Sequence, residues 1–426
     1  MDLDVFDRRE STVRTYCRDF PTVFERACGH ELRDEAGKRY IDFLSGAGAL
    51  NYGHNNDAMR SRIIEYMNSD GIVHSLDLYT TAKRQFLEAF ERYILVPRAL
   101  DYKVQFCGPT GTNAVEAALK IARKTTGRQN VIAFTNAFHG MSLGALAATG
   151  SRAKRGGSGI SLSQVTRMPF DGYLGREIDT SAFLQKAIED PGSGVDLPAA
   201  IILETIQAEG GINTASARWL KAIVGVARAC GALVIVDEIQ TGCGRTGPFF
   251  SFEDAGIVPD VVCLSKSISG YGLPMSLLLM RPHVDTWKPG EHNGTFRGNN
   301  IAFVAATVGL EYWIDGKFES EVRSKGLHVS ERLAAIARKH NGATVRGRGL
   351  LQGIAWEDKT VASEVSHLAF ERGVIVEVCG ARNEVLKLLP PLTIPLRALD
   401  EGISTIEECL AEVLTGEKRK SIDDGW

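Results

Sequence analysis

The sequence predicts an α/β fold, in which a large domain with a mostly parallel sheet carries a smaller α+β domain beside it. Three observations predict this. The chain has 426 residues, 44% of them hydrophobic and 24% charged, which is enough for more than one packed domain. Its middle alternates short runs rich in Val and Ile with helical patterns, as βαβ units do. Its two ends show a different order of hairpin, helices and isolated strands.

The elements of the middle follow from hydrophobic patterning. Short β-branched runs bounded by turn residues indicate strands, and longer amphipathic segments between them indicate helices. We expect strands at residues 103–107, 130–134, 199–206, 232–238 and 259–265. We expect helices at residues 112–126 and 217–231.

The two ends of the chain are expected to pack together as the smaller domain. Near the start, residues 30–46 predict a hairpin with its turn near residues 35–37. The C-terminal part predicts a helix at 318–340 and a strand at 349–356. A second helix, a strand at 374–378 and a final helix are expected to follow. We therefore assign residues 1–60 to an N-terminal segment that joins the small domain, residues 61–315 to the large domain and residues 316–426 to the C-terminal small domain.

The charge balance argues against nucleic acid or an anionic membrane as a partner. Lys and Arg total 49 and Asp and Glu total 52, which leaves a net charge of −3. The first ten residues are acidic and polar, unlike a signal peptide. The longest apolar runs fall well short of the ~18 residues that span a bilayer. We therefore expect a cytoplasmic protein with small molecules as partners.

The eight cysteines predict neither a disulfide framework nor a metal site. They are scattered along the chain, with no CxxC pair and no Cys/His cluster at metal-ligand spacing. We expect reduced thiols, several of them buried, and no bound metal.

A candidate phosphate site lies at Gly108–Asn113, which follows a predicted strand and opens a helix. Backbone N–H groups at a helix N-terminus bind phosphate, and a Gly-containing turn lets the anion approach them. The plainer alternative is an ordinary helix cap made by Thr110 or Thr112. This motif alone does not decide between the two interpretations.

An acid and a lysine follow at the ends of later strands. Asp237 ends the strand predicted at 232–238, and Lys266 follows the strand predicted at 259–265. The carboxyl ends of parallel strands are where ligands bind in such sheets, so we expect both side chains at one edge. Pyridoxal phosphate needs a phosphate site, an acid facing its pyridine nitrogen and a lysine that forms a Schiff base with its aldehyde. The three motifs together indicate that cofactor.

Two further motifs are weaker. Phe138 comes just after a predicted strand and could stack on a flat cofactor ring, but a core Phe beside a structural His139 is the plainer interpretation. The run GCGRTG at residues 242–247 matches the dinucleotide pattern G-x-G-x-x-G. Pro248 and several aromatic residues follow it where a helix should begin, so nicotinamide binding stays a minor alternative.

The order of the motifs resembles the class-III pyridoxal-phosphate aminotransferases of fold type I. The motifs are GPTGTNAVEAALKIAR, NAFHG, ETIQAEGG, VDEIQTGCGRTG, LSKSISG and NGTFRGN, and the likeness covers nearly the whole chain. Within that family, GAGALNYGHN, FHGMSLGALA, SKSISGYGLPM and EHNGTFRGNN are most similar to the diaminobutyrate–2-oxoglutarate transaminases of ectoine biosynthesis. The resemblance implies a seven-stranded, mostly parallel sheet in the large domain and a small α+β domain built from both chain ends.

The resemblance also implies roles for cofactor residues. Lys266 would hold the cofactor covalently, and Asp237 would keep its pyridine nitrogen protonated. Further cofactor contacts would come from Gly111, Thr112, Phe138, Ile239 and Gln240. Thr295 would reach the phosphate bound in the other subunit, so the active unit would be at least a homodimer with shared active sites.

For the substrate, the resemblance implies two residues and shows two departures. Glu209 resembles the family's gating glutamate, which pairs with a cationic substrate-binding residue, here Lys387. Relatives of the ornithine and GABA type usually carry Arg where this chain has Met141 and Lys387. A lysine offers a point charge instead of a bidentate fork, so carboxylate recognition must differ.

The expected reaction moves an amino group from L-glutamate to the aldehyde of L-aspartate 4-semialdehyde and yields L-2,4-diaminobutyrate and 2-oxoglutarate. Three alternatives remain open. They are another class-III ω-aminotransferase acting on ornithine, lysine or a polyamine, a pyridoxal-phosphate racemase or mutase, and a nicotinamide oxidoreductase. The pathway (ectoine, a siderophore or an antibiotic), the oligomer size above the dimer and any potassium dependence also stay open.

Overall fold

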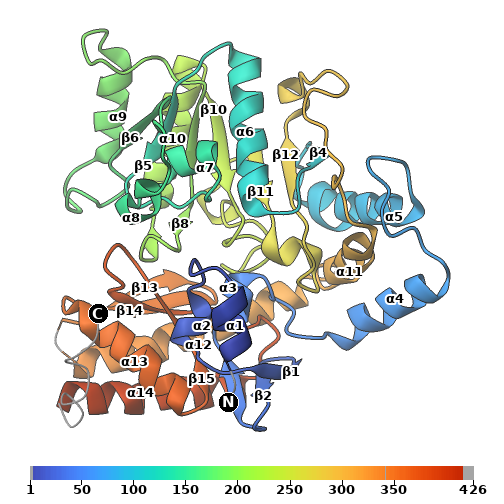
Figure 1. Cartoon of the computed structure of the whole chain (residues 1–426). Coiled ribbons are helices and arrows are strands. Elements are labelled where there is room, and N and C mark those ends of the chain that lie inside the picture. The colour runs from blue at the N-terminus through green and yellow to red at the C-terminus, as the bar shows by residue number, and fades with distance from the viewer. Residues whose placement is uncertain (1–2, 341, 416–426) are drawn as a thin grey trace.

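The computed structural model describes residues 3–340 and 342–415, and a seven-stranded sheet with the order β4-β12-β11-β10-β7-β5-β6 forms its centre (Figure 1). The strands are β4 Lys103–Phe106, β5 Val131–Phe134, β6 Val165–Met168, β7 Ala200–Leu203, β10 Leu233–Asp237, β11 Val261–Leu264 and β12 Leu277–Met280. Strands β6, β5, β7, β10 and β11 run parallel, whereas β12 is antiparallel to both β11 and β4. The predicted α/β class and mostly parallel seven-stranded sheet are therefore confirmed.

Alternate residues of the central strands pack into two cores, one on each face of the sheet. Ile235 lies in one core with the buried face of helix α6 (Gly111–Thr126). Val234 and Val236 lie in the other core with Trp219 of helix α10 (Ala217–Cys230). Both faces are thus covered, which explains why these strands are almost continuously hydrophobic in sequence.

The sequence patterns located five of these strands and gave no prediction for β6 or β12. Four of the five end within two residues of the expected bounds. The run expected at 199–206 is divided into β7 and a separate short strand, β8 (Ile206–Gln207), which pairs with β9 (Asn213–Thr214). Strand β12 sits between β11 and β4, an arrangement that depends on tertiary pairing and not on local pattern.

The two ends of the chain meet in one sheet, as the sequence predicts. Strands β1 (Phe24–Cys28), β2 (Glu31–Asp34) and β3 (Arg39–Asp42) are antiparallel, and β3 pairs in parallel with β15 (Val374–Ile375). The expected hairpin is the β2–β3 pair. Figure 1 shows these elements below the central sheet, with α13 and α14 beside them. The domain boundaries after residues 60 and 315 stay predictions.

A second four-stranded sheet completes this part of the molecule, with the order β13-β14-β17-β16. Its strands are β13 Thr344–Arg348, β14 Leu351–Ala355, β16 Glu377–Cys379 and β17 Val385–Leu388. The single strand expected at 374–378 is divided, because β15 and β16 belong to different sheets. This division places residue 377 next to β17, where it matters for the site.

The other helices cover the sheets and connect the strands. They are α1 Asp4–Arg9, α2 Tyr16–Asp19, α3 Ser45–Gly48, α4 Asp57–Asn68, α5 Thr81–Phe90, α7 Leu143–Ala148, α8 Arg152–Gly156, α9 Thr180–Glu189, α11 Asn300–Glu311, α12 Lys317–Lys339, α13 Lys359–Glu371 and α14 Leu396–Thr415. Short helical turns are η1 Glu91–Leu95, η2 Val96–Arg98, η3 Glu253–Ala255, η4 Lys266–Ser269 and η5 Pro282–Val284. Within the described ranges, no helix combines the length and apolarity needed to cross a bilayer. All eight cysteines are free thiols, and five of them are buried.

The GCGRTG run holds a buried arginine that joins three distant parts of the chain. Residues 242–247 form turns and no helix begins in them, so the dinucleotide context is missing. Arg245 is completely buried and donates to the carbonyl oxygens of Leu350 (3.1 Å) and Pro390 (2.5 Å). It also donates to Asn51 Oδ1 at 2.5 Å. The guanidinium therefore ties the large domain to both end segments.

We expect Arg245→Met to destabilise the protein by about 3 kcal/mol or more, because it leaves buried acceptors without donors. The measurement is the free energy of unfolding from urea denaturation. The control is Arg84→Met, whose side chain is 69% exposed and should change stability by less than about 0.5 kcal/mol. Equal effects of the two substitutions would contradict the role assigned to Arg245.

Candidate functional site

A cavity of about 180 Å³ opens at the carboxyl ends of the parallel strands. It lies where the loops after β5, β7, β10 and β11 meet the first residues of α6. Its lining residues are Gly111, Thr112, Phe138, His139, Gly140, Glu204, Glu209, Asp237, Ile239, Gln240, Thr241 and Lys266. Of the residues predicted from the sequence, only Thr295 and Lys387 do not line it.

The first turn of α6 has backbone amides available to an anion. Thr110 occupies the N-cap position, but its side chain makes no capping hydrogen bond to the helix in the described part of the chain. Its hydroxyl instead accepts a hydrogen bond from the side-chain amide of Asn113 at 2.6 Å. The first amides of a helix have no partner inside the helix, and the helix dipole favours negative charge there. These contacts favour a phosphate site over an ordinary cap.

A glycine lets the loop after β5 pass close to this turn. Gly140 has a φ of +129°, and a Cβ on it would lie 2.4 Å from Thr112 Oγ1. The hydroxyl oxygens of Thr112 and Ser142 are 2.5 Å apart, and Ser142 donates to Glu116 Oε1 at 2.7 Å. The loop and the start of α6 are therefore fixed against each other at the floor of the cavity.

Two hydrogen-bonding contacts hold the Asp237 side chain at the end of β10. Its Oδ2 lies 2.8 Å from Nδ1 of His139, and its Oδ1 accepts from the Ile239 amide at 3.0 Å. Both side chains are buried, which strengthens their interaction. The Nε2 atom of His139 is buried and has no hydrogen-bond partner among the described residues. His139 and the Ile239 amide thus fix the orientation of a carboxylate that lines the cavity.

Lys266 sits directly after β11 in a strained conformation. Its φ is +52°, a region that residues with a Cβ seldom occupy, and such strain is characteristic of functional sites. Its ammonium donates to the carbonyl oxygen of Ala47 at 2.8 Å. Burial lowers the pKa of Lys266, and the negative charge of Glu209 only partly opposes this. A lysine that loses its proton more readily is a better nucleophile.

Apolar side chains form the walls of the cavity. Ile239 packs against Gly111, where a Cβ would lie 3.0 Å from the Ile239 side chain. The amide of Phe138 donates to Glu204 Oε2 at 3.0 Å, and Lys154 Nζ lies 4.5 Å from the centre of the Phe138 ring. Burial raises the pKa of Glu204 well above its usual value, and the negative charge of Asp237 raises it further.

Glu209 connects the cavity to a buried ion pair. Its Oε1 accepts from Lys387 Nζ at 2.6 Å and from Gln240 Nε2 at 3.2 Å. The ammoniums of Lys387 and Lys266 lower the pKa of Glu209 even though burial works to raise it. Gln240 also donates to the carbonyl oxygen of Ala47, the group that accepts from Lys266. Lys387 is buried behind Glu209, which explains its absence from the cavity lining.

Besides Lys387, two residues discussed in the sequence analysis lie outside the cavity. Thr295 is exposed, in a segment where Phe296 makes an edge contact with His74 at 5.2 Å between ring centres. Met141 is 54% exposed and does not line the cavity. The roles assigned to individual residues from the sequence stay predictions, and the geometry shows which of them share one site.

The sequence patterns assign no functional role to three residues that the structure places in or beside the site. His139 was interpreted as structural, although it lies against Asp237. Glu204 stands in the motif ETIQAEGG without an assigned role. Glu377 is a lone acid in the apolar strand run VIVEV, facing Lys387, a lone base in the run VLKLL. A charged residue inside each of two apolar runs is a signal that could have paired them.

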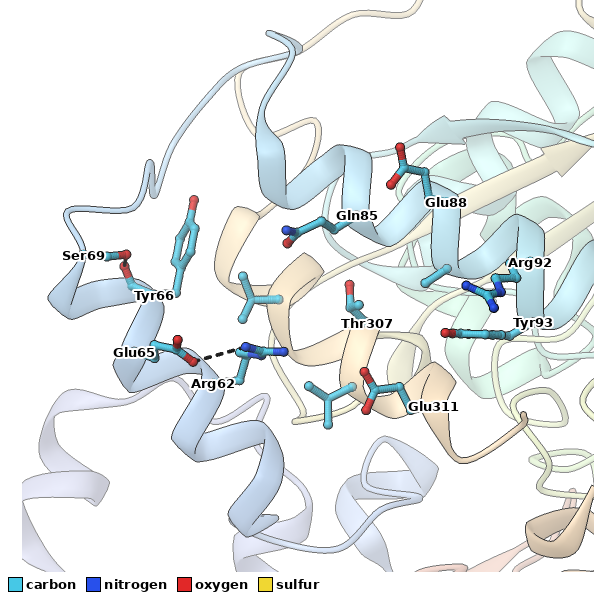
Figure 2. A pocket seen from close by; sticks show the side chains of 13 residues that line it. Arg62, Glu65, Tyr66, Ser69, Gln85, Glu88, Arg92, Tyr93, Thr307 and Glu311 are labelled. Carbon is cyan, nitrogen blue, oxygen red and sulfur yellow. Dashed lines mark hydrogen bonds and ion pairs between the residues drawn. The ribbon is translucent and has the colours of Figure 1, made fainter. Parts of the chain in front are cut away.

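A larger hollow of about 410 Å³ lies elsewhere, among residues of α4, α5, η1 and α11 (Figure 2). Its lining is mostly polar, with both signs of charge, and Arg62 and Glu65 pair with each other along α4 at 3.2 Å. It contains no lysine and no start of a helix, so the chemistry belongs to the smaller cavity. In the described ranges, no group of three or more His, Cys, Asp or Glu residues is placed to hold a metal ion.

The chain is similar to known proteins over nearly its whole length. Residues 14–410 match the family model "Aminotransferase class-III". The chain is 56% identical over 411 residues to a diaminobutyrate–2-oxoglutarate transaminase from Streptomyces anulatus, covering 96% of this chain and 98% of that one. It is 53% identical to the protein of the same name from Halalkalibacterium halodurans, covering 96% of each chain. A solved ornithine aminotransferase from Toxoplasma gondii, with partial occupancy of PLP at its active site, is 26% identical at a TM-score of 0.84, covering 97% of this chain and 95% of that one.

We expect Gly140→Ala to weaken the anion site, because its Cβ would clash with Thr112. Inorganic phosphate should raise the melting temperature of the wild type and not that of the variant. Gly127→Ala is the matched control, since Gly127 also has a positive φ (+70°) at the other end of α6 but has open space around it. Both substitutions place a Cβ at a positive φ, which costs roughly 1–3 kcal/mol. An equal response of both variants to phosphate would contradict the predicted phosphate site.

Proposed function

Because this chain belongs to the class-III aminotransferase family, we propose that it is a pyridoxal-phosphate-dependent diaminobutyrate–2-oxoglutarate transaminase. It moves the amino group of L-glutamate to the aldehyde of L-aspartate 4-semialdehyde and forms 2-oxoglutarate and L-2,4-diaminobutyrate. One observation carries the chemistry. Asp237 and the strained Lys266 line one cavity together with the uncapped start of α6.

The cavity fits the cofactor in each of the features that pyridoxal phosphate requires. The amides of Gly111 and Thr112 at the helix start can bind a phosphate. Gly140 lets the loop after β5 lie close to Thr112. Ile239 and Phe138 supply apolar surface for the two faces of a flat ring. When bound, the cofactor supplies an aldehyde that carries the amino group between substrates and a ring that accepts electrons.

Asp237 acts on the pyridine nitrogen. A carboxylate there keeps a proton on that nitrogen and so favours the withdrawal of electrons from the reacting carbon. His139 fixes the orientation of the carboxylate through the 2.8 Å contact to Oδ2. The Ile239 amide holds the other oxygen, so both carboxylate oxygens of Asp237 have a fixed partner.

Lys266 has two tasks at the reacting atoms. Its Nζ would hold the cofactor covalently, and as a free amine it could accept a proton from the substrate carbon and return it. Burial lowers its pKa, which favours the neutral amine that both tasks need. The carbonyl of Ala47 orients Nζ at 2.8 Å.

The active unit is a homodimer with shared sites. Thr295 lies outside the cavity of its own chain and is exposed, as a residue that reaches a second subunit would be. Several large apolar side chains around it are also exposed, which is typical of a surface that a partner covers: Ile72, Val73, Leu76, Leu78, Tyr79 and Phe296. A cytoplasmic location and a place in ectoine biosynthesis complete the proposal.

The first test is the visible absorption spectrum of the protein loaded with pyridoxal phosphate. L-glutamate should remove the visible band and aspartate 4-semialdehyde should restore it. Lys266→Ala should form no covalent link and have no activity. Asp237→Asn should bind the cofactor but lose activity by about 10³-fold or more. Because each 1.4 kcal/mol of barrier is a factor of ten in rate, this loss corresponds to about three such increments. An active Lys266→Ala enzyme would contradict the proposed mechanism.

A mixed dimer tests the shared site. Thr295→Ala and Lys266→Ala homodimers should both be inactive at a cofactor concentration that leaves the Thr295→Ala protein unloaded. A dimer with one subunit of each kind has one site with both native residues if Thr295 serves the neighbouring subunit. We therefore expect about half of the wild-type activity from purified mixed dimers. Inactive mixed dimers would show that Thr295 serves its own chain, and a Thr295→Ala homodimer that loads and reacts like the wild type would show that it serves neither.

A further inference from the structure

Lys387 lies completely buried between two carboxylates. Its Nζ is 2.6 Å from Glu209 Oε1 and 3.2 Å from Glu377 Oε1. Glu377 comes from β16 and Lys387 from the neighbouring β17, where the two residues are paired across the sheet. Gln240 Oε1 accepts from Lys387 Nζ at 3.4 Å. Lys387 is completely buried among these oxygens and does not line the cavity, so its ammonium is not open to a substrate carboxylate.

This cluster has one positive charge for two acids. Glu377 is buried, and its Oε1 has no hydrogen bond within the described part of the chain although it lies near the lysine. Burial raises the pKa of Glu377 in spite of Lys387, so its buried charge is only partly compensated by the lysine. A second cation placed nearby would balance the remaining negative charge of the cluster.

The open side of the cluster faces the cavity. Both Lys387 and Gln240 contact Oε1 of Glu209, and Glu209 also lines the cavity beside Lys266. Its Oε2 is therefore the oxygen that a cationic group in the cavity can reach. The other titratable groups near the two acids are Tyr16, Lys266 and Cys379.

We propose that Glu377 makes this cluster a recognition site for a second ammonium on the substrate, so that the enzyme selects diamino acids. The inference rests on the proposed function and names a specificity residue within it. Glu209 contacts the ammonium, and Glu377 acts through Lys387 by keeping the cluster one negative charge in excess. With Glu377 neutral, Lys387 would cancel the charge of Glu209 and the attraction would be lost.

Two probes isolate the effect of that ammonium. L-2,4-diaminobutyrate and 4-aminobutyrate share the carboxylate and the reacting amine at carbon 4, and differ in the amine at carbon 2. For each probe, the measurement is the concentration dependence of the rate at which the visible band of the loaded enzyme disappears. The ratio of the two apparent second-order rate constants reports the contribution of the second ammonium.

The decisive variant is Glu377→Gln, which keeps the shape and removes the charge. We expect the preference for diaminobutyrate to fall by about tenfold or more, because a buried charge interaction is poorly screened. The rate with 4-aminobutyrate should change little, a split that a merely structural role would not produce. Glu377→Asp retains the charge and should retain much of the preference.

The matched control is Glu384→Gln, on the same hairpin. The Glu384 side chain accepts from the amide of Arg382 and makes no contact with Lys387, so its ratio should equal that of the wild type. An unchanged ratio in Glu377→Gln, or an equal loss with both probes, would overturn this inference alone. A wild type that does not react with diaminobutyrate at all would overturn the proposed function and this inference with it.

Discussion

Charge buried at the carboxyl edge of the central sheet is the constraint on which the rest of the site depends. A charge in this environment must have a partner, because an isolated one costs several kcal/mol. Asp237 has His139, and Lys387 has Glu209 and Glu377. Each of these partners comes from a different segment of the chain. The site therefore exists only when the segments are assembled.

The same requirement holds the molecule together around the site. Arg245 donates to two backbone carbonyls of the C-terminal segment and to the side chain of Asn51 in the N-terminal segment. Gln240 donates to the carbonyl of Ala47, also in the N-terminal segment. That carbonyl also accepts from Lys266. The strained backbone of Lys266 is thus supported by the surrounding segments. Residues of both chain ends therefore support the cavity through direct hydrogen bonds.

The sequence predicted the class of fold and the middle strands because their burial on both faces leaves a continuous hydrophobic signal. It gave no prediction for β12, whose antiparallel position depends on its neighbours. It located Asp237 and Lys266 because strand ends of a parallel sheet meet at one edge. It interpreted His139 as structural, since a histidine beside a phenylalanine carries no local mark of its contact with Asp237.

The sequence by itself determined the α/β class, the family and the residue types that the chemistry needs, since these follow from local pattern and motif order. Only the tertiary structure decided how those residues are partnered. It left the start of α6 without a cap from Thr110 and buried Lys387 behind Glu209. It also brought Glu377 against Lys387 by dividing one apolar run between two sheets. The physical reason is that charge balance in a buried site depends on distances between segments, which no local pattern contains.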